Sequence, residues 1–110
     1  MASIITLQQI PNQALSVQVD GNFYEIRITA GKSTMNVDMY RNNALIISGF
    51  RIVAGSLFIA YRYLEAGNFF IQTVNQEIPY YPKFGSTQKL IYIPQVELNS
   101  IRARFQNDLI

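Results

Sequence analysis

The sequence contains no cysteine, no histidine and no tryptophan. Without cysteine there is no disulfide bond, zinc–thiolate site or thiol nucleophile, and cysteine usage says nothing about the redox compartment. Without histidine the chain lacks the most common general base and the usual transition-metal ligand. No glycine-rich phosphate-binding motif or nucleophile elbow is present either. We therefore expect a protein that is not an enzyme and that binds no cofactor or metal.

Charge is also scarce: charged residues make up 15% of the 110 residues, against about 25% in a typical globular domain. The net charge is only +2, and no three basic residues are adjacent, so the basic patch typical of nucleic-acid-binding proteins is missing. Residues 1–13 contain no basic residue and only a short apolar run, unlike a signal peptide or a transmembrane segment. We expect a soluble chain made in the cytoplasm, whose surface is either covered by partners or rich in uncharged polar groups.

Apolar residues recur at every second position through most of the chain, a period that indicates β-strands. Six of them flank a Gly21 and Asn22 loop, which we interpret as a type II′ hairpin turn. This register places Val19 opposite Tyr24 and puts all six side chains on one buried face. The six residues are Leu15, Val17, Val19, Tyr24, Ile26 and Ile28.

Turn signals at intervals of 8–12 residues predict an all-β fold, either a small antiparallel barrel or a sandwich of about seven strands. It forms a single domain over residues 1–110, with its core in residues 3–93 and a C-terminal extension in residues 94–110. The extension is ambiguous, because its apolar residues fit both a strand and a helix. Further strands are expected at residues 35–39, at 44–53 as a central strand either bent or bulged at Gly49, and at 57–64, 69–74 and 88–94.

The long segment over residues 75–87 combines aromatic residues and prolines with little charge, a composition enriched at protein interfaces. It either contacts a partner or folds back to cap its own core, and the sequence leaves both open. We assign a candidate partner interface to this segment and to the C-terminal extension. Its residues are Tyr80, Tyr81, Pro82, Phe84, Arg102, Arg104 and Phe105.

Two other functions remain open at this point. A pair of carboxylates could support hydrolysis, but the acidic residues are scattered, and we interpret Asp20, Glu25, Asp38 and Glu65 as solvated surface charges. Aromatic and basic residues alternate in "AYRYL" (60–64), as in small barrels that bind single-stranded nucleic acid. In a strand, however, Tyr61 and Tyr63 would share a face with apolar neighbours, which favours a place in the core.

The order of several short motifs resembles the small baseplate plug proteins of contractile-tailed bacteriophages. These motifs are "IPNQALSVQVDGNFYEIRI", "LIISGFRIVAGSLF", "EAGNFFI" and "YYPKFGSTQKLIYI", and together they span roughly residues 3 to 93. The extension after Pro94 does not map to the family. The positions that carry the resemblance are Pro11, Asn12, Gln13, Gly49, Gly67, Asn68, Phe69, Phe84, Gly85, Leu90 and Tyr92.

The resemblance implies a non-enzymatic protein of the virion, located in the tail baseplate and made in the cytoplasm of a bacterial host. It implies a position near the central hub and the end of the tail tube, and several copies in each virion. The implied partners are other tail and baseplate proteins, such as hub, tube or wedge components, with no membrane and no nucleic acid. The alternative is a small β-barrel that binds single-stranded nucleic acid.

Overall fold

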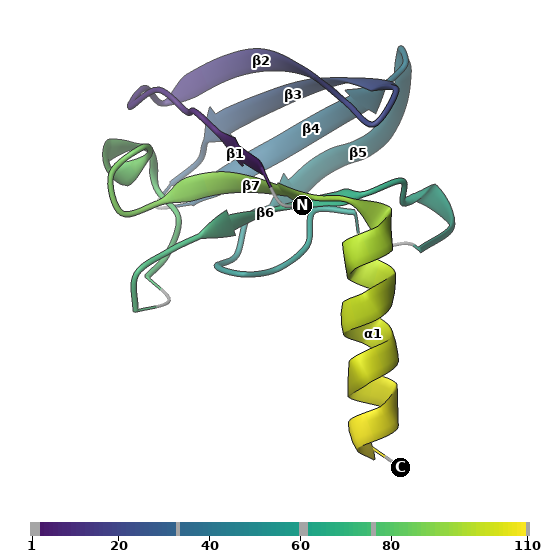
Figure 1. The fold of residues 1–110 in the computed structure, drawn as a ribbon. Coiled ribbons are helices and arrows are strands. Elements are labelled where there is room, and N and C mark those ends of the chain that lie inside the picture. Colours follow the sequence, from purple (N-terminus) through teal and green to yellow (C-terminus); the bar gives the residue numbers. More distant parts are fainter. Residues whose placement is uncertain (1–2, 33, 60–61, 76, 110) are drawn as a thin grey trace.

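The computed structural model describes residues 3–32, 34–59, 62–75 and 77–109, and within them all side chains except those of Arg62 and residues 104–109. Two antiparallel sheets face each other, and a single helix follows the last strand (Figure 1). One sheet contains, in order, β2 (Asn12–Val19), β3 (Asn22–Ala30), β4 (Met35–Arg41) and β5 (Ala44–Arg51). The other contains, in order, β1 (Ser3–Ile5), β7 (Lys89–Ile93) and β6 (Asn68–Gln72). Short 3-10 turns, η1 (Arg62–Leu64) and η2 (Tyr81–Lys83), and the helix α1 (Gln95–Leu109) complete the described elements.

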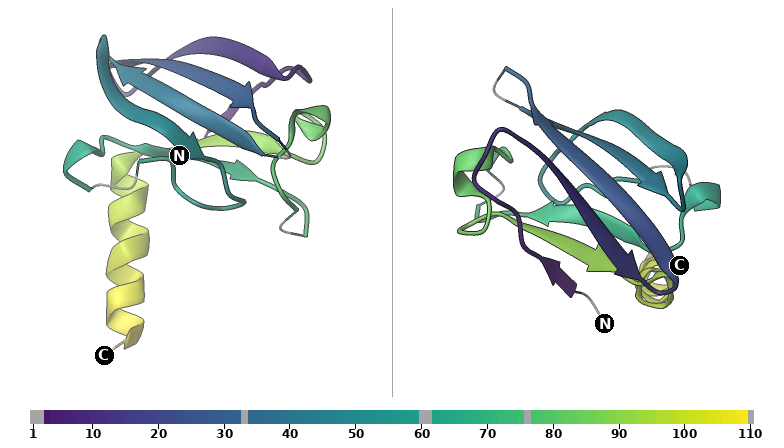
Figure 2. Two further views of the ribbon diagram at one scale, coloured as in Figure 1. Left: turned by 180° about the vertical axis from the view of Figure 1, so that it is seen from behind. Right: turned by 90° about the horizontal axis from the view of Figure 1, so that it is seen from above.

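The predicted all-β class is confirmed, and the arrangement is a sandwich rather than a closed barrel (Figure 2). The ambiguous C-terminal extension is a helix, and its far end lies well away from both sheets (Figure 1 and the left view of Figure 2).

The opening hairpin forms, but its predicted register is wrong by two residues. The two turn residues are Asp20 and Gly21, with φ angles of 49° and 78°, which fits a type I′ turn rather than type II′. Val19 therefore pairs with Asn22, and Val17 pairs with Tyr24. Because side chains alternate with a period of two, a shift of two residues leaves every apolar side chain on the expected face.

The predicted bulge at Gly49 is confirmed, whereas the central position of this strand is wrong: β5 lies at the edge of its sheet. Gly49 has a φ of 66°, and its N–H donates to Asp38 Oδ1 at 2.6 Å instead of continuing the ladder. The apolar run reflects the partial cover of Ile47 and Phe50 by the core, while Leu45 is 53% exposed. An apolar run shows that a strand has non-polar neighbours, not where it lies in the sheet.

The strand predicted at residues 57–64 does not form in the described part of that range. Phe58 donates its N–H to the Phe69 carbonyl, but Ile59 is bound by the side chain of Asn68, through its N–H and its carbonyl at 2.9 Å each. The chain then turns into η1, where Tyr63 is 83% exposed. A core position for Tyr63 is therefore wrong, and Tyr61 lies outside the described residues.

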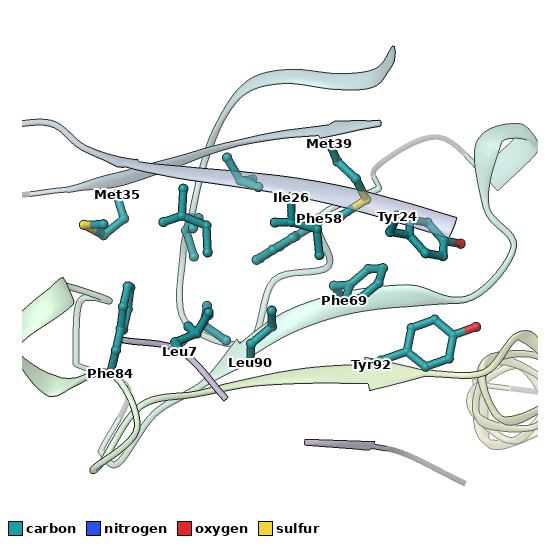
Figure 3. Packing of buried hydrophobic residues seen from close by; sticks show 14 of the residues in the cluster. Leu7, Tyr24, Ile26, Met35, Met39, Phe58, Phe69, Phe84, Leu90 and Tyr92 are labelled. Atoms are coloured by element: carbon teal, nitrogen blue, oxygen red, sulfur yellow. The ribbon is translucent and has the colours of Figure 1, made fainter. Parts of the chain in front are cut away.

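The core lies between the two sheets and is rich in aromatic rings (Figure 3). The ring of Phe69 lies 5.0 Å from that of Tyr24 and 5.0 Å from that of Tyr92, measured between centroids. Contacts of this kind contribute about 0.5–1.5 kcal/mol each beyond the burial of area. They join β3 of one sheet to β6 and β7 of the other at one end of the sandwich.

The face assignment of β3 predicts opposite outcomes for two nearby substitutions. Ile26 is fully buried, so Ile26→Asp places an unpaired charge in the core. We expect this variant to lose its cooperative thermal transition in circular dichroism, because a domain of this size has only about 5–15 kcal/mol of stability.

Thr29→Asp is the matched control, because Thr29 lies on the same strand with its side chain exposed. We expect the melting temperature of this variant to stay within a few degrees of the wild-type value. An equal loss of thermal stability in Ile26→Asp and Thr29→Asp would contradict the face assignment of β3.

Candidate interface and the junction at the base of the helix

The aromatic segment predicted as an interface is partly built into the core. Phe84 is fully buried, whereas Tyr80 and Tyr81 are half-buried and pack against the core cluster with their ring centroids 4.9 Å apart. Pro82 and Lys83 are exposed. The structure thus brings Tyr80, Tyr81 and Pro82 together at the surface and uses Phe84 to anchor the segment from below.

Side-chain hydrogen bonds hold this segment in place. Gln88 is buried, and its amide accepts from the Tyr80 N–H at 2.8 Å and donates to the Ile78 carbonyl at 3.0 Å. Glu77 accepts from Lys83 at 2.6 Å and from Thr87 at 2.8 Å, and these hydrogen bonds lower the pKa of Glu77. The segment therefore presents a defined surface, fixed by partners on both sides.

Exposed apolar side chains also occur at Ile78 of this segment and at Val53, just after β5. Ile78 is 62% exposed and Val53 is 49% exposed. Between them lies a depression of about 150 Å³, lined by residues 51–54 and 77–79. We call Val53, Ile78, Tyr80, Tyr81 and Pro82 the apolar patch. Isolated exposed apolar residues are common, but a contiguous group of them is typical of a contact site.

The other predicted interface residues lie on α1. Arg102 is only 25% exposed, because its guanidinium forms an ion pair with Glu65 of the same chain. Its Nη1 contacts Glu65 Oε1 at 2.5 Å, and its Nη2 contacts Oε2 at 2.9 Å. The side chains of Arg104 and Phe105 lie outside the described residues.

Sequence reasoning also placed Glu65 wrongly, since Glu65 is not a solvated turn charge. Its side chain is 1% exposed, and it also accepts from Asn68 Nδ2 at 2.5 Å and from Gln95 Nε2 at 2.9 Å. Burial alone raises the pKa of Glu65, but the hydrogen bonds from Arg102, Gln95 and Asn68, together with the charge of Arg102, lower it to about 2. Glu65 and Arg102 are 37 residues apart, and no local pattern marks such a pair.

The residues next to Glu65 join both sheets. The Tyr24 hydroxyl donates to the Ala66 carbonyl at 3.2 Å, and the Tyr92 hydroxyl donates to Asp20 Oδ2 at 2.7 Å, so Asp20 is not a free surface charge either. Burial raises the pKa of Tyr92, and Asp20 raises it further. The N–H of Gly67 donates to Gln95 Oε1 at 2.9 Å. We call residues 65–68 the junction, because β3, β7 and α1 all bind there.

A comparison with protein families gives the functional context for this geometry. A family model described as "Cyanophage baseplate Pam3 plug gp18" matches residues 2–95. The chain belongs to this family of baseplate plug proteins. Membership identifies the chain as a structural protein of the phage tail baseplate. It also confirms the resemblance to baseplate plug proteins that the sequence motifs indicated. A search of curated proteins found no match.

The family match ends at residue 95, which is the first residue of α1. Glu65 lies within the match, while Arg102 lies beyond it. The described helices of this plug-family chain include none that is both long and apolar enough to cross a membrane.

The Glu65 pKa predicts how the stability of this plug-family chain depends on pH. A carboxylate whose pKa is lower in the folded state contributes stability that is fully present above its ordinary value of 4.5 and is lost as the pH falls toward about 2. We expect the free energy of unfolding, measured with urea, to differ most between wild type and Glu65→Gln above pH 4.5. This difference in free energy should shrink steadily as the pH falls toward about 2. A difference independent of pH would contradict this account.

Gly67 predicts a steric effect at the junction. Its φ is 93°, and a Cβ atom there would lie 2.2 Å from the Tyr92 hydroxyl oxygen. Gly55 has a φ of 73° but has open space around it, which makes it a matched control. We expect Gly55→Ala to lose about 1–2 kcal/mol from its backbone conformation alone, and Gly67→Ala to lose a further 1–3 kcal/mol or so from overpacking. Chemical denaturation of both variants measures the difference, and equal losses would show that Tyr92 moves aside freely.

Proposed function

We propose that this plug-family chain acts near the central hub and the end of the tail tube, where it fits between other baseplate proteins. The observation that carries this proposal is the family match over residues 2–95, which includes the whole sandwich. The low charge of the chain and the apolar patch support a role that depends on contacts with proteins. We propose that the chain performs no catalysis, that it is made in the cytoplasm of the bacterial host and that several copies occupy each virion.

We propose the apolar patch as the contact surface for a neighbouring tail or baseplate protein. Interface cores favour tyrosine and apolar side chains and contain little charge. The patch presents such side chains on a segment that Gln88 and Phe84 fix from below, so little conformational entropy is lost when a partner binds. Arg104 and Phe105 stay in the proposal as candidate contacts of α1, whereas Arg102 acts within the chain.

The mechanism we propose depends on fixed shape. Before contraction the sandwich occupies its position in the baseplate and keeps its neighbours in the assembled arrangement. When the tail contracts, the neighbours move, and the contacts at the patch break or rearrange. A body whose surface segments are held by hydrogen bonds suits this role, because its contact groups keep their relative positions while the neighbours change.

The apolar patch predicts an assembly defect in the double variant Tyr80→Ala, Tyr81→Ala. Both rings are half-buried, so we expect a modest loss of melting temperature and a large loss of incorporation into virions. The measurement is complementation of a phage that lacks the gene. Infectious particles are counted, and the protein content of purified tails is determined.

The matched control is Phe84→Leu, which shortens a fully buried side chain beneath the same segment. We expect Phe84→Leu to lower the melting temperature at least as much as the double tyrosine variant does, while its incorporation into virions stays intact. If the tyrosine variant is incorporated normally and only melts earlier, the segment is a cap of the core and the patch is not the contact surface. That outcome would leave the family assignment untouched.

A further inference from the structure

The helix α1 is joined to the sandwich by several polar contacts, made by Gln95 and Arg102. The hydrophobic core cluster includes no described residue of α1. Leu98 is 4% exposed, but Val96 is 75% exposed and Ile101 is 39% exposed. Beyond its first turns the helix extends away from both sheets (Figures 1 and 2). Among the described side chains of α1, apolar burial is therefore confined to Leu98, which lies one turn from the start of the helix.

Two turns beyond Gln95, Arg102 of α1 contacts the sandwich again through its pair with Glu65. The guanidinium presents two nitrogens to the two carboxylate oxygens, a planar arrangement that a lysine ammonium cannot reproduce. Glu65 is 1% exposed, whereas Arg102 is 25% exposed, so the carboxylate is enclosed and the cation enters from the solvent side. Asn68 and Gln95 satisfy the remaining acceptor positions of Glu65.

The enclosed carboxylate of Glu65 favours a cation beside it. A buried carboxylate without a partner is costly, and hydrogen bonds from two amides do not neutralise its charge. Asn68 belongs to β6, and Gln95 follows β7 after a single proline, so both amides stay beside Glu65 whether or not the rest of α1 is docked. Glu65, Asn68 and Gln95 thus define the binding position of the guanidinium independently of Arg102.

We propose that Glu65, Asn68 and Gln95 form a socket that is selective for a guanidinium group, and that Arg102 in this socket is a latch that holds α1 against the sandwich. When the latch opens, the part of α1 beyond Gln95 undocks, while Gln95 and the sandwich keep their places. The core cluster, which contains no described residue of the helix, is what keeps the sandwich folded in that state.

The test is chemical rescue of Arg102→Ala, followed by backbone order parameters from nuclear magnetic resonance. We expect the order parameters of residues 99–103 to fall from about 0.85 to below about 0.6, the values of rigid and flexible backbone. The resonances of β3 and β4 should keep their native dispersion. Millimolar methylguanidinium should restore the order parameters in a saturable way, because it refills the socket.

Two controls define the selectivity. Methylammonium at the same concentration should restore the order parameters of Arg102→Ala much less than methylguanidinium does. In the double variant Glu65→Gln, Arg102→Ala, methylguanidinium should leave the order parameters unchanged. The proposal is overturned if α1 stays ordered in Arg102→Ala, or if β3 and β4 lose their dispersion together with α1. Equal rescue by methylammonium, or rescue of the double variant, would show that the socket is not a guanidinium site.

Discussion

Every polar group buried at the junction, residues 65–68, needs a hydrogen-bond partner. The partners come from α1, from the four-stranded sheet and from the segment 57–59, so this requirement links these parts of the structure. The carboxylate of Glu65 binds α1, and the Ala66 carbonyl accepts the hydroxyl of Tyr24 from the four-stranded sheet. Asn68 binds both backbone groups of Ile59, which ends the strand-like course of that segment. One short turn thus fixes an end of the core, the position of the helix and the path of residues 57–59.

The function proposed for this plug-family chain depends on shape and contact chemistry. The sandwich matches the family over residues 2–95, and its aromatic core joins the two sheets where the junction also binds them. At another part of the surface, Gln88 and Phe84 hold the apolar patch in a defined arrangement. Both regions show the same design, in which buried amide side chains fix irregular segments that would otherwise lack backbone partners.

Much of this fold was predictable because strand patterning is local. The period of two in residues 15–28 identified the buried face even though the turn was misplaced, since an error of two residues preserves the face. The bulge at Gly49 was predictable for a similar reason, because a glycine within a strand marks a local departure from the ladder. The family was recognisable from the order of its motifs.

The candidate site was harder to predict, because it depends on contacts distant in sequence. The pair of Glu65 and Arg102 forms only once β7 and α1 are placed, and neither residue has a neighbour in sequence that marks it. Gln88 and Asn68 look like ordinary polar residues, yet both are fully buried. In the described part of residues 57–64 the predicted strand does not form, because the side chain of Asn68, only nine residues from Ile59, replaces the backbone partner that the apolar pattern implied.

The measurement that tests the central claim most directly is electron cryomicroscopy of the intact phage tail. The account predicts density for a seven-stranded sandwich with a projecting helix in the central baseplate, between the hub and the end of the tail tube. The apolar patch should be covered by a neighbouring protein. Absence of the protein from purified tails, or a position outside the baseplate, would contradict the account.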